Sequence, residues 1–372
     1  MNRASVCAFQ AVTLLLPFAA SAQRPALKPT LPPRLDSTIA RFMSANHVPG
    51  LSAALVVNGA YAWSEGFGMV DLESLVPATP QTLFRLASVS KPLTAIAALQ
   101  LLQSGKLDLD APVQRYCPAF PIKPWPISTR EVLGHLGGIR HYRSGTLEDP
   151  EVASTKHFTD PIAGGVSFFA ADTLVAKPGT RFNYSTHGYT LVGCVIEGAA
   201  GERYAEYMRV HVFSPIGMTH TVVDDRYAII PNRTRFYHWD TAGQVVNAAY
   251  LDNSYKLPGG GWLSSADDLA RFEVAMLHDA LVSRAMRTMA WTPQRTSDGA
   301  STGYGLGWGI DTVGRRVGHD GGQQGTSTII LLAPDEQAGV VVLANIDGVD
   351  VGPLARDLLA LALGSVSPSA KP

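Results

Sequence analysis

Two residues, Ser88 and Lys91, have the types and spacing that nucleophilic catalysis requires. They stand three positions apart in Ser88-Val89-Ser90-Lys91, where the chain enters an Ala-, Leu- and Ile-rich helix predicted over residues 89–103. That spacing is one helical turn, which places both side chains on one face. A serine hydroxyl is a weak nucleophile until a base takes its proton. A lysine near the positive end of a helix, with another cation nearby, has a lowered pKa and can assist.

The same two residues also have a purely structural interpretation, in which Ser88 caps the helix and Lys91 is solvated. A Ser-x-x-Lys match arises by composition roughly once in a chain of this length, so the motif alone is weak. Its meaning therefore depends on what the rest of the sequence offers.

A tyrosine in a suitable context supplies the first support. Tyr184-Ser185-Thr186 stands just before an apolar helix predicted over residues 186–200. A tyrosine held near a lysine can exist partly as phenolate, and so act as a base for serine and later as an acid for the leaving group. The alternative is a core tyrosine whose hydroxyl is hydrogen bonded.

A glycine-rich segment at the end of a strand supplies the second piece of support for a catalytic Ser88. His319-Asp320-Gly321-Gly322 ends a strand predicted over residues 315–319. Small residues there let a substrate lie against the strand edge, and a backbone N–H group of the segment could complete an oxyanion hole. The alternative is a turn between two strands, and a second His-x-Gly at His135 shows how readily the pattern arises.

Other kinds of site find little support in the sequence. The ten histidines form no His-x-His pair or HExxH motif, and the spacing of His135 and His141 is a weak indication of zinc, so we expect no metal. Phosphate-binding and dinucleotide-binding glycine motifs are missing from the sequence. Ser301 lies in a GxSxG pattern, but a polar, turn-like segment precedes it and a strand pattern follows, which predicts a loop rather than a nucleophile elbow.

The overall composition is that of a globular protein with a sizeable core, since 46% of the 372 residues are hydrophobic. Thirty basic and 31 acidic residues give a net charge of −1, which argues against binding to nucleic acid or to a membrane surface through a polybasic patch. The 35 glycines and 25 prolines predict many turns.

The N-terminus resembles an export signal. Residues 1–22 combine a basic start, a short apolar run and small residues at Ala20 and Ala22, which is typical of a cleaved signal peptide. The apolar run is shorter than the about 20 residues that span a bilayer, so we expect secretion, to a bacterial periplasm, without a stable membrane anchor. Residues 23–33 predict a Pro-rich leader, and residues 365–372 a flexible tail. Cys117 and Cys194 would remain, either as a disulfide or as buried free thiols.

Hydrophobic periodicity predicts the order of the remaining elements. A capping box, Ser128-Thr129-Arg130-Glu131, opens a short helix, and Asn58-Gly59 indicates a hairpin turn. The other helices are predicted at residues 35–43, 203–213, 265–278 and 351–363, and the other strands at 51–57, 61–67, 305–311, 326–332 and 339–345.

This order predicts an α/β protein of the α+β type, with an antiparallel sheet completed by both chain ends. The sheet domain comprises residues 34–110 and 255–364, and a mostly helical insert comprises residues 111–254.

The ordered motifs resemble the penicillin-recognising serine hydrolases, and specifically the class C β-lactamase-related family. Residues 232–277 are especially similar to the mitochondrial serine β-lactamase-like branch of that family in animals. The flanking segments that carry the likeness are Phe84-Arg85-Leu86-Ala87-Ser88, Gly105-Lys106-Leu107-Asp108-Leu109-Asp110, His135-Leu136-Gly137-Gly138-Ile139, Asp252-Asn253-Ser254-Tyr255-Lys256 and Gly259-Gly260-Gly261-Trp262-Leu263-Ser264-Ser265.

The resemblance implies a β-lactamase/transpeptidase-like fold with a pocket between sheet and helices. It also implies an acyl-enzyme on Ser88, proton transfer by Lys91 and Tyr184, an oxyanion hole at the backbone N–H groups of Ser88 and Gly322, and no cofactor. Thr186 stands where the family carries asparagine, and His319 where it carries lysine. These departures favour an ester or peptide substrate over a β-lactam. A true β-lactamase or D-Ala-D-Ala carboxypeptidase, and a non-catalytic scaffold on the same fold, remain as alternatives.

Overall fold

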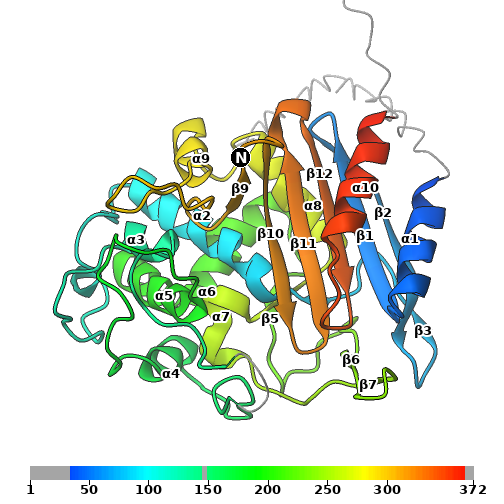
Figure 1. The fold of residues 1–372 in the computed structure, drawn as a ribbon, viewed down its shortest axis with the longest axis horizontal. Coiled ribbons are helices and arrows are strands. Elements are labelled where there is room, and N and C mark those ends of the chain that lie inside the picture. The colour runs from blue at the N-terminus through cyan, green and yellow to red at the C-terminus, as the bar shows by residue number, and fades with distance from the viewer. Residues whose placement is uncertain (1–33, 145–148, 365–372) are drawn as a thin grey trace, which may run out of the picture. The chain divides into compact units, whose positions relative to one another are not determined.

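An antiparallel sheet of seven strands organises the described part of the protein (Figure 1). The computed structural model describes residues 34–144 and 149–364. The predicted signal peptide, leader and tail lie outside these residues. Across the sheet the strands follow the order β3 (Val76–Pro77), β2 (Ala60–Asp71), β1 (Gly50–Val57), β12 (Ala338–Ala344), β11 (Thr326–Ala333), β10 (Arg316–Gln323) and β9 (Gly309–Asp311). Because β1 pairs with β12, the early and late parts of the chain complete one sheet, as the sequence predicts.

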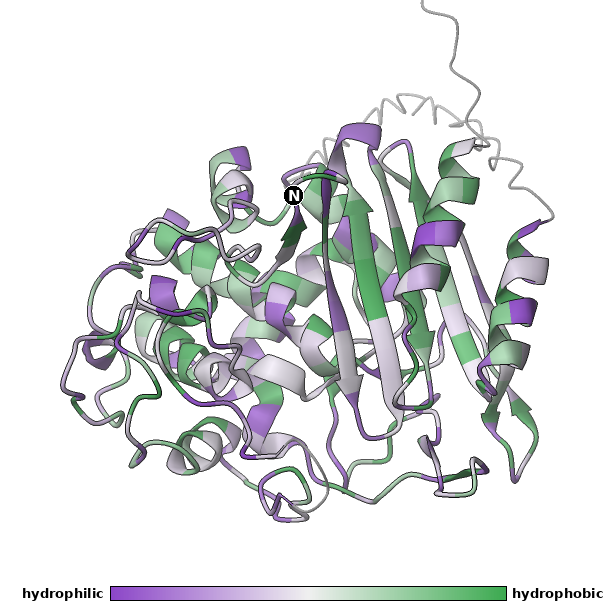
Figure 2. Ribbon diagram, viewed as in Figure 1, coloured by the Kyte–Doolittle hydropathy of each residue, from purple (hydrophilic) through white to green (hydrophobic). Residues whose placement is uncertain are grey.

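The central strands are buried on both faces, and alternate residues belong to two different cores. Leu51, Ala53 and Leu55 of β1 pack in the core beneath two terminal helices, whereas Ala54 and Val56 pack in the larger core on the opposite face. The terminal helices are α1 (Arg34–Ala45) and α10 (Gly352–Gly364), and α8 (Ala266–Leu277) contacts the other face (Figure 1). The sheet is therefore the middle of three layers, with hydrophobic residues along its inner strands (Figure 2).

The larger core continues from the sheet into the helices that carry the predicted site. The described helices between α1 and α8 are α2 (Ser90–Gln103), α3 (Thr129–Leu133), α4 (Pro161–Ser167), α5 (Thr186–Ala200), α6 (Tyr204–Tyr207) and α7 (Leu257–Gly260), and α9 (Arg284–Ala290) follows α8. Two smaller sheets comprise β4 (Phe84–Arg85), β8 (Trp262–Ser264) and β5 (Val222–Val223), and β6 (Tyr237–Trp239) with β7 (Val245–Asn247). Helix α2 is apolar on all sides and packs against α5 and α7, which explains its almost complete burial.

Local capping signals in the sequence correspond to observed helix starts. Ser128 and Glu131 form the predicted capping box of α3. The side chain of Ser185 accepts a hydrogen bond from the Gly188 N–H group and so caps α5. Ser88 is different: it lies in a 3₁₀ turn, Ala87–Val89, that precedes α2, and its side chain caps no helix.

Two predicted elements are shorter than their sequence patterns suggest. The strand predicted over residues 305–311 is limited to Gly309–Asp311, because Gly307 has a φ of +87° and a Cβ atom there would lie 2.5 Å from Ala95 Cβ. The helix predicted over residues 203–213 is α6 followed by a π-helical segment, Met208–Phe213. Residues 111–254 contain α3 to α6 and also β5 to β7, and the predicted domain boundaries stay a prediction.

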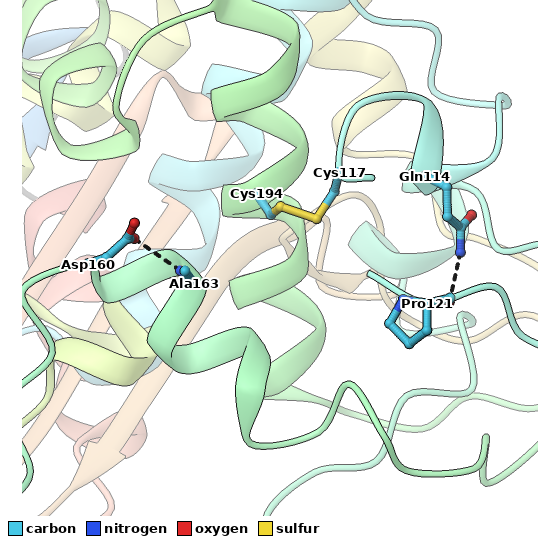
Figure 3. The surroundings of a disulfide bond; sticks show 6 residues. All are labelled: Gln114, Cys117, Pro121, Asp160, Ala163 and Cys194. Carbon is cyan, nitrogen blue, oxygen red and sulfur yellow. Dashed lines mark hydrogen bonds between the residues drawn. A yellow bond between two sulfur atoms is a disulfide. The ribbon is translucent and has the colours of Figure 1, made fainter. Parts of the chain in front are cut away.

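Cys117 and Cys194 form a disulfide (Figure 3). Of the two alternatives that the sequence left open, the structure therefore selects the bond. It ties the segment after the 3₁₀ turn Val113–Arg115 to α5, the helix that begins at Thr186.

We expect the double substitution Cys117→Ser with Cys194→Ser to lower the free energy of unfolding by about 4 kcal/mol, because the bond closes a long loop and restricts the unfolded chain. The two cysteines are 77 positions apart. Urea unfolding with and without a reducing agent measures the effect, and the reducing agent should change the unfolding of the natural chain but not that of the double variant. Equal stability of oxidised and reduced natural protein would contradict the expectation.

A buried carboxyl group, Glu273 of α8, lies in the layer beneath the sheet. A Cβ atom on Gly339 of β12 would lie 2.5 Å from its Oε2 atom, so the carboxyl packs directly against the strand. Burial raises the pKa of Glu273 well above its ordinary value, and backbone groups of Leu331 and Val340 offset only part of that effect. The folded state therefore favours the neutral acid.

The free energy of unfolding of the natural protein should decrease as the pH rises, because Glu273 must then ionise in a buried position. We expect the Glu273→Gln variant not to show this decrease. A carboxyl with a raised pKa binds a proton more strongly in the folded than in the unfolded state, so its favourable contribution is complete below the unfolded pKa and decreases above it. The difference in unfolding free energy between variant and natural protein should grow by up to about 1.4 kcal/mol per pH unit above about pH 4.5. Denaturant unfolding from pH 4 to 8 measures it, with the exposed Glu65→Gln as control for the lost charge. A difference that does not change with pH would contradict the expectation.

Candidate active site

Ser88 lies in a tight turn between β4 and α2. The residue before it, Ala87, has a φ of +47°, an uncommon conformation for a residue with a side chain. Ser88 is partly exposed although both of its neighbours are buried, so the turn brings this one hydroxyl to a surface pocket. Strain of this kind is typical of functional positions.

The Lys91 amine lies next to the Ser88 hydroxyl, at a Nζ–Oγ distance of 2.9 Å. It also lies 2.9 Å from the carbonyl oxygen of Gly259 and 3.2 Å from the Oγ1 atom of Thr186. Lys91 is completely buried, and these three oxygens from α7, α5 and the Ser88 turn surround its amine. The structure thus brings Ser88, Lys91 and Thr186 together.

Burial lowers the pKa of Lys91 well below its ordinary value, and the positive charge of Lys256 lowers it further. Asp320 acts in the opposite direction. Compared with a solvated lysine, Lys91 is therefore biased toward the neutral amine, the form that can accept a proton.

Tyr184 completes the cluster beside Ser88. The Lys91 Nζ atom lies 4.8 Å from the centre of the Tyr184 ring, and the His135 ring packs against the same tyrosine at 4.2 Å between centres. Burial raises the pKa of Tyr184, while a hydrogen bond with Ser88 partly opposes the shift. The phenol is consequently the favoured form, rather than the phenolate that the sequence interpretation allowed.

His319 lies next to Tyr184, with 6.2 Å between the ring centres, and is not among the residues that line the pocket at Ser88. Its Nε2 atom is 2.9 Å from the Tyr304 hydroxyl, and its Nδ1 atom is 2.5 Å from the Asp320 carbonyl oxygen. Burial lowers the pKa of His319 to about 4, with the charge of Lys91 as the next cause. The imidazole is therefore neutral at pH 7; it packs against Tyr184 and lines a second cavity together with that residue, and its predicted role in substrate binding stays a prediction.

Gly321 and Gly322 of β10 have different places in the site. A Cβ atom on Gly321 would lie 2.5 Å from the Leu86 carbonyl oxygen and 3.1 Å from the Ser88 nitrogen, so this glycine lets the strand approach the Ser88 turn closely. Gly322 is open, with nothing within 4 Å of its Cβ position, and it lines the pocket beside Ser88. The sequence suggested space for a substrate at both glycines, but at Gly321 the chain itself fills that space.

The pocket at Ser88 has a volume of about 160 Å³, well below that of a site for a drug-sized ligand. It is bounded by the Ser88 turn, the end of β10, α7, the start of α5 and the segment around Tyr142. Its lining residues are Ala87, Ser88, His141, Tyr142, Val152, Thr186, Lys256, Gly259, Gly260, Gly322, Gln323 and Gln324.

Lys256 is the pocket residue that sequence reasoning missed as a functional candidate. The signal that could have indicated it is a lysine that stands shortly before the glycine run Gly259-Gly260-Gly261. His135 and Tyr304, which pack around Tyr184, were missed because no local pattern links positions so far apart in the chain.

Some alternative sites can be judged on the described residues. Ser301 is exposed in a loop, as predicted, where it forms a single bridge with Arg295. Within residues 34–144 and 149–364, no group of His, Cys, Asp or Glu is arranged to hold a metal ion. Helices long and apolar enough to cross a membrane are also missing from these residues.

An antiparallel sheet covered by helices, with a Ser–Lys–Tyr cluster where the two meet, defines the class of β-lactamase-like and penicillin-binding-protein-like serine hydrolases. The chain belongs to the Beta-lactamase family, whose family model matches residues 35–364.

Relatives of known name support this membership. The human mitochondrial serine beta-lactamase-like protein LACTB is 31% identical over 380 residues, an alignment that covers 77% of this chain and 69% of that protein. Penicillin-binding protein 4* of Bacillus subtilis is 28% identical, with 77% and 66% covered. The octameric penicillin-binding protein homologue from Pyrococcus abyssi has a similar structure, with a TM-score of 0.76 and 28% identity over 89% of this chain and 77% of that one.

Proposed function

We propose that this protein is a secreted serine hydrolase that cleaves an ester or amide through an acyl-enzyme on Ser88. The observation that carries the proposal is the 2.9 Å separation between Ser88 Oγ and the fully buried Lys91 Nζ. A nucleophile in hydrogen-bond contact with a desolvated base is the arrangement that activated serines require.

The surroundings of Lys91 suggest how the proton moves. A neutral amine has two N–H groups and one lone pair. The Gly259 carbonyl oxygen and Thr186 Oγ1 lie where they can accept the two N–H groups, which leaves the lone pair for the Ser88 proton. Lys91 takes that proton as Ser88 Oγ forms a bond to the acyl carbon.

The remaining steps use groups at the pocket edge. The N–H groups of Ser88 and Gly322 are the proposed donors to the oxyanion. When the bond to the leaving alcohol or amine breaks, Tyr184, as a phenol, donates a proton to it and regains one from Lys91. A water molecule then attacks the acyl carbon and loses a proton to Lys91. As the bond between that carbon and Ser88 Oγ breaks, Lys91 returns the proton to Ser88 and the acid is released.

The charge and size of the site favour a small ester or peptide over a β-lactam. His319 stands where β-lactamases carry a permanently charged lysine, yet this imidazole is neutral at pH 7 and is hydrogen bonded to Tyr304. Thr186 stands where they carry an asparagine, and its hydroxyl lies against Lys91.

Export is part of the proposal because a disulfide between Cys117 and Cys194 is stable in an oxidising compartment such as the bacterial periplasm. The predicted signal at residues 1–22 is in accord with that destination.

We expect Ser88→Ala to abolish covalent labelling by a fluorophosphonate probe and to lower the hydrolysis of short 4-nitrophenyl esters by at least about 10³-fold, because no other described group replaces the nucleophile. Intact-protein mass spectrometry measures the labelling. Ser301→Ala, in the GxSxG loop, is the matched control and should behave like the natural protein. Labelling that survives Ser88→Ala would refute the proposal, whereas fast nitrocefin turnover would favour the β-lactamase alternative.

We expect kcat/KM for a neutral ester to remain high at pH 7 and to fall toward acid pH, because protonation of Lys91 removes the base. Burial and the Lys256 charge place the pKa of Lys91 well below 10.5, so the acid limb should lie far below the pH at which a solvated lysine titrates. A pH–rate profile from pH 5 to 10, with the enzyme checked for stability at each pH, provides the measurement. A rate that keeps rising up to pH 10 would show that Lys91 is not the neutral base.

A further inference from the structure

A second lysine, Lys256, lines the pocket beside Ser88. It lies at the end of the 3₁₀ turn Ser254–Lys256, directly before α7, and only 3% of its surface is exposed. Its Nζ atom lies 5.8 Å from the centre of the Tyr142 ring and 5.5 Å from that of Tyr255. Among the described residues its side-chain amine forms no hydrogen bond and no ion pair, so a buried amine lines the pocket without a partner anion.

Asp224, the carboxylate whose charge acts on Lys256, is already engaged by other groups. Asp224 forms an ion pair with Arg85 at 2.8 Å, lies 3.8 Å from Arg233, and accepts a hydrogen bond from Asn253 at 2.7 Å. Two arginines therefore share this carboxylate, which leaves it less able to neutralise Lys256.

The described lining of the pocket contains no carboxylate that would compete with a bound anion for Lys256. Among the described residues that line it, none is an aspartate or glutamate. His141, the other titratable base in the lining, is neutral at pH 7 because burial lowers its pKa to about 3. An ammonium group that burial has stripped of water gains most from an anionic partner in such surroundings.

We infer that Lys256 binds a carboxylate of the substrate, which makes the protein selective for small acyl donors that carry a free acid group a few atoms from the scissile bond. The inference rests on the proposed hydrolase function and specifies its substrate class. Lys256 is assigned as a specificity-determining residue in place of the lysine that is missing at position 319.

The pocket dimensions and position agree with this role. Ser88 and Lys256 line the same cavity of about 160 Å³, which has room for one short acyl chain beside the nucleophile. Burial, reinforced by Arg85, lowers the pKa of Lys256 to about 7 in the free protein, and a bound carboxylate would raise it and so stabilise the charged form.

A matched pair of esters tests the inference. Mono-4-nitrophenyl glutarate carries a free carboxylate, and its methyl ester has the same chain without the charge. We expect the natural protein to prefer the acid, and Lys256→Met to lower the ratio of the two kcat/KM values by about tenfold or more, mainly through KM, because a charge-assisted hydrogen bond is lost. Lys106→Met, an exposed change just beyond the C-terminal end of α2, is the matched control and should leave the ratio unchanged.

A second readout does not depend on turnover. Glutarate ions should raise the Tm of the natural protein and of the Lys106→Met variant, but not that of Lys256→Met or Lys256→Gln. Fluorophosphonate labelling of Ser88 and the Tm without glutarate show that each Lys256 variant is folded.

The possible outcomes separate the two proposals. An equal effect of Lys256→Met on both esters would overturn the carboxylate role and show that Lys256 acts only through the charge it exerts on Lys91. A lysine-dependent effect of glutarate on Tm without hydrolysis of either ester would instead reject the hydrolase and keep the carboxylate site.

Discussion

The burial of the Lys91 amine is the constraint on which the rest of the site depends. Within the described residues Lys91 forms no ion pair, and three neutral oxygens from different parts of the chain contact its amine instead. This arrangement favours a neutral amine, because neutral oxygens compensate the loss of water less well for a cation than a carboxylate would. It also requires that α5, α7 and the Ser88 turn meet at one point, which the shared hydrophobic core of these elements ensures. Loss of that packing would return Lys91 to water and to its ordinary pKa.

The sheet contributes to the site through one strand and one close approach. Strand β10 can lie against the Ser88 turn only because position 321 has no side chain, and the next residue, Gly322, then reaches the edge of the pocket. Outside the lining of the pocket, the rings of His135, Tyr184 and Tyr304 pack together with His319. Tyr184 is thereby held away from water as a phenol. Their surroundings, rather than their ordinary pKa values, make Tyr184 the acid and Lys91 the base.

Two lysines with different surroundings have different roles in this interpretation. Lys91 is enclosed by protein oxygens, whereas Lys256 faces the cavity with aromatic rings beside it. Each charge disfavours the other, so a carboxylate bound at Lys256 would also reduce the repulsion that Lys256 exerts on Lys91. Substrate charge and base strength are therefore coupled in a pocket that contains no acidic residue among those described. Because of this coupling, a Lys256 substitution changes the base strength of Lys91 for every substrate. Only the ratio of the kcat/KM values for a charged and an uncharged substrate isolates the contact with the carboxylate.

Patterns along the sequence indicated the elements, because the short apolar runs of β1 and β12, the capping box at Ser128 and the apolar run of α2 are local signals with a direct physical cause. They also indicated Ser88 and Lys91, which one helical turn places side by side. Only the tertiary structure decided the environment of these residues. The packing of His319 against Tyr184, the pairing of Cys117 with Cys194 and the exposure of Lys256 to the pocket depend on contacts between segments distant in the chain. Burial and neighbouring charges set the pKa of a group, and they exist only once those segments have packed together.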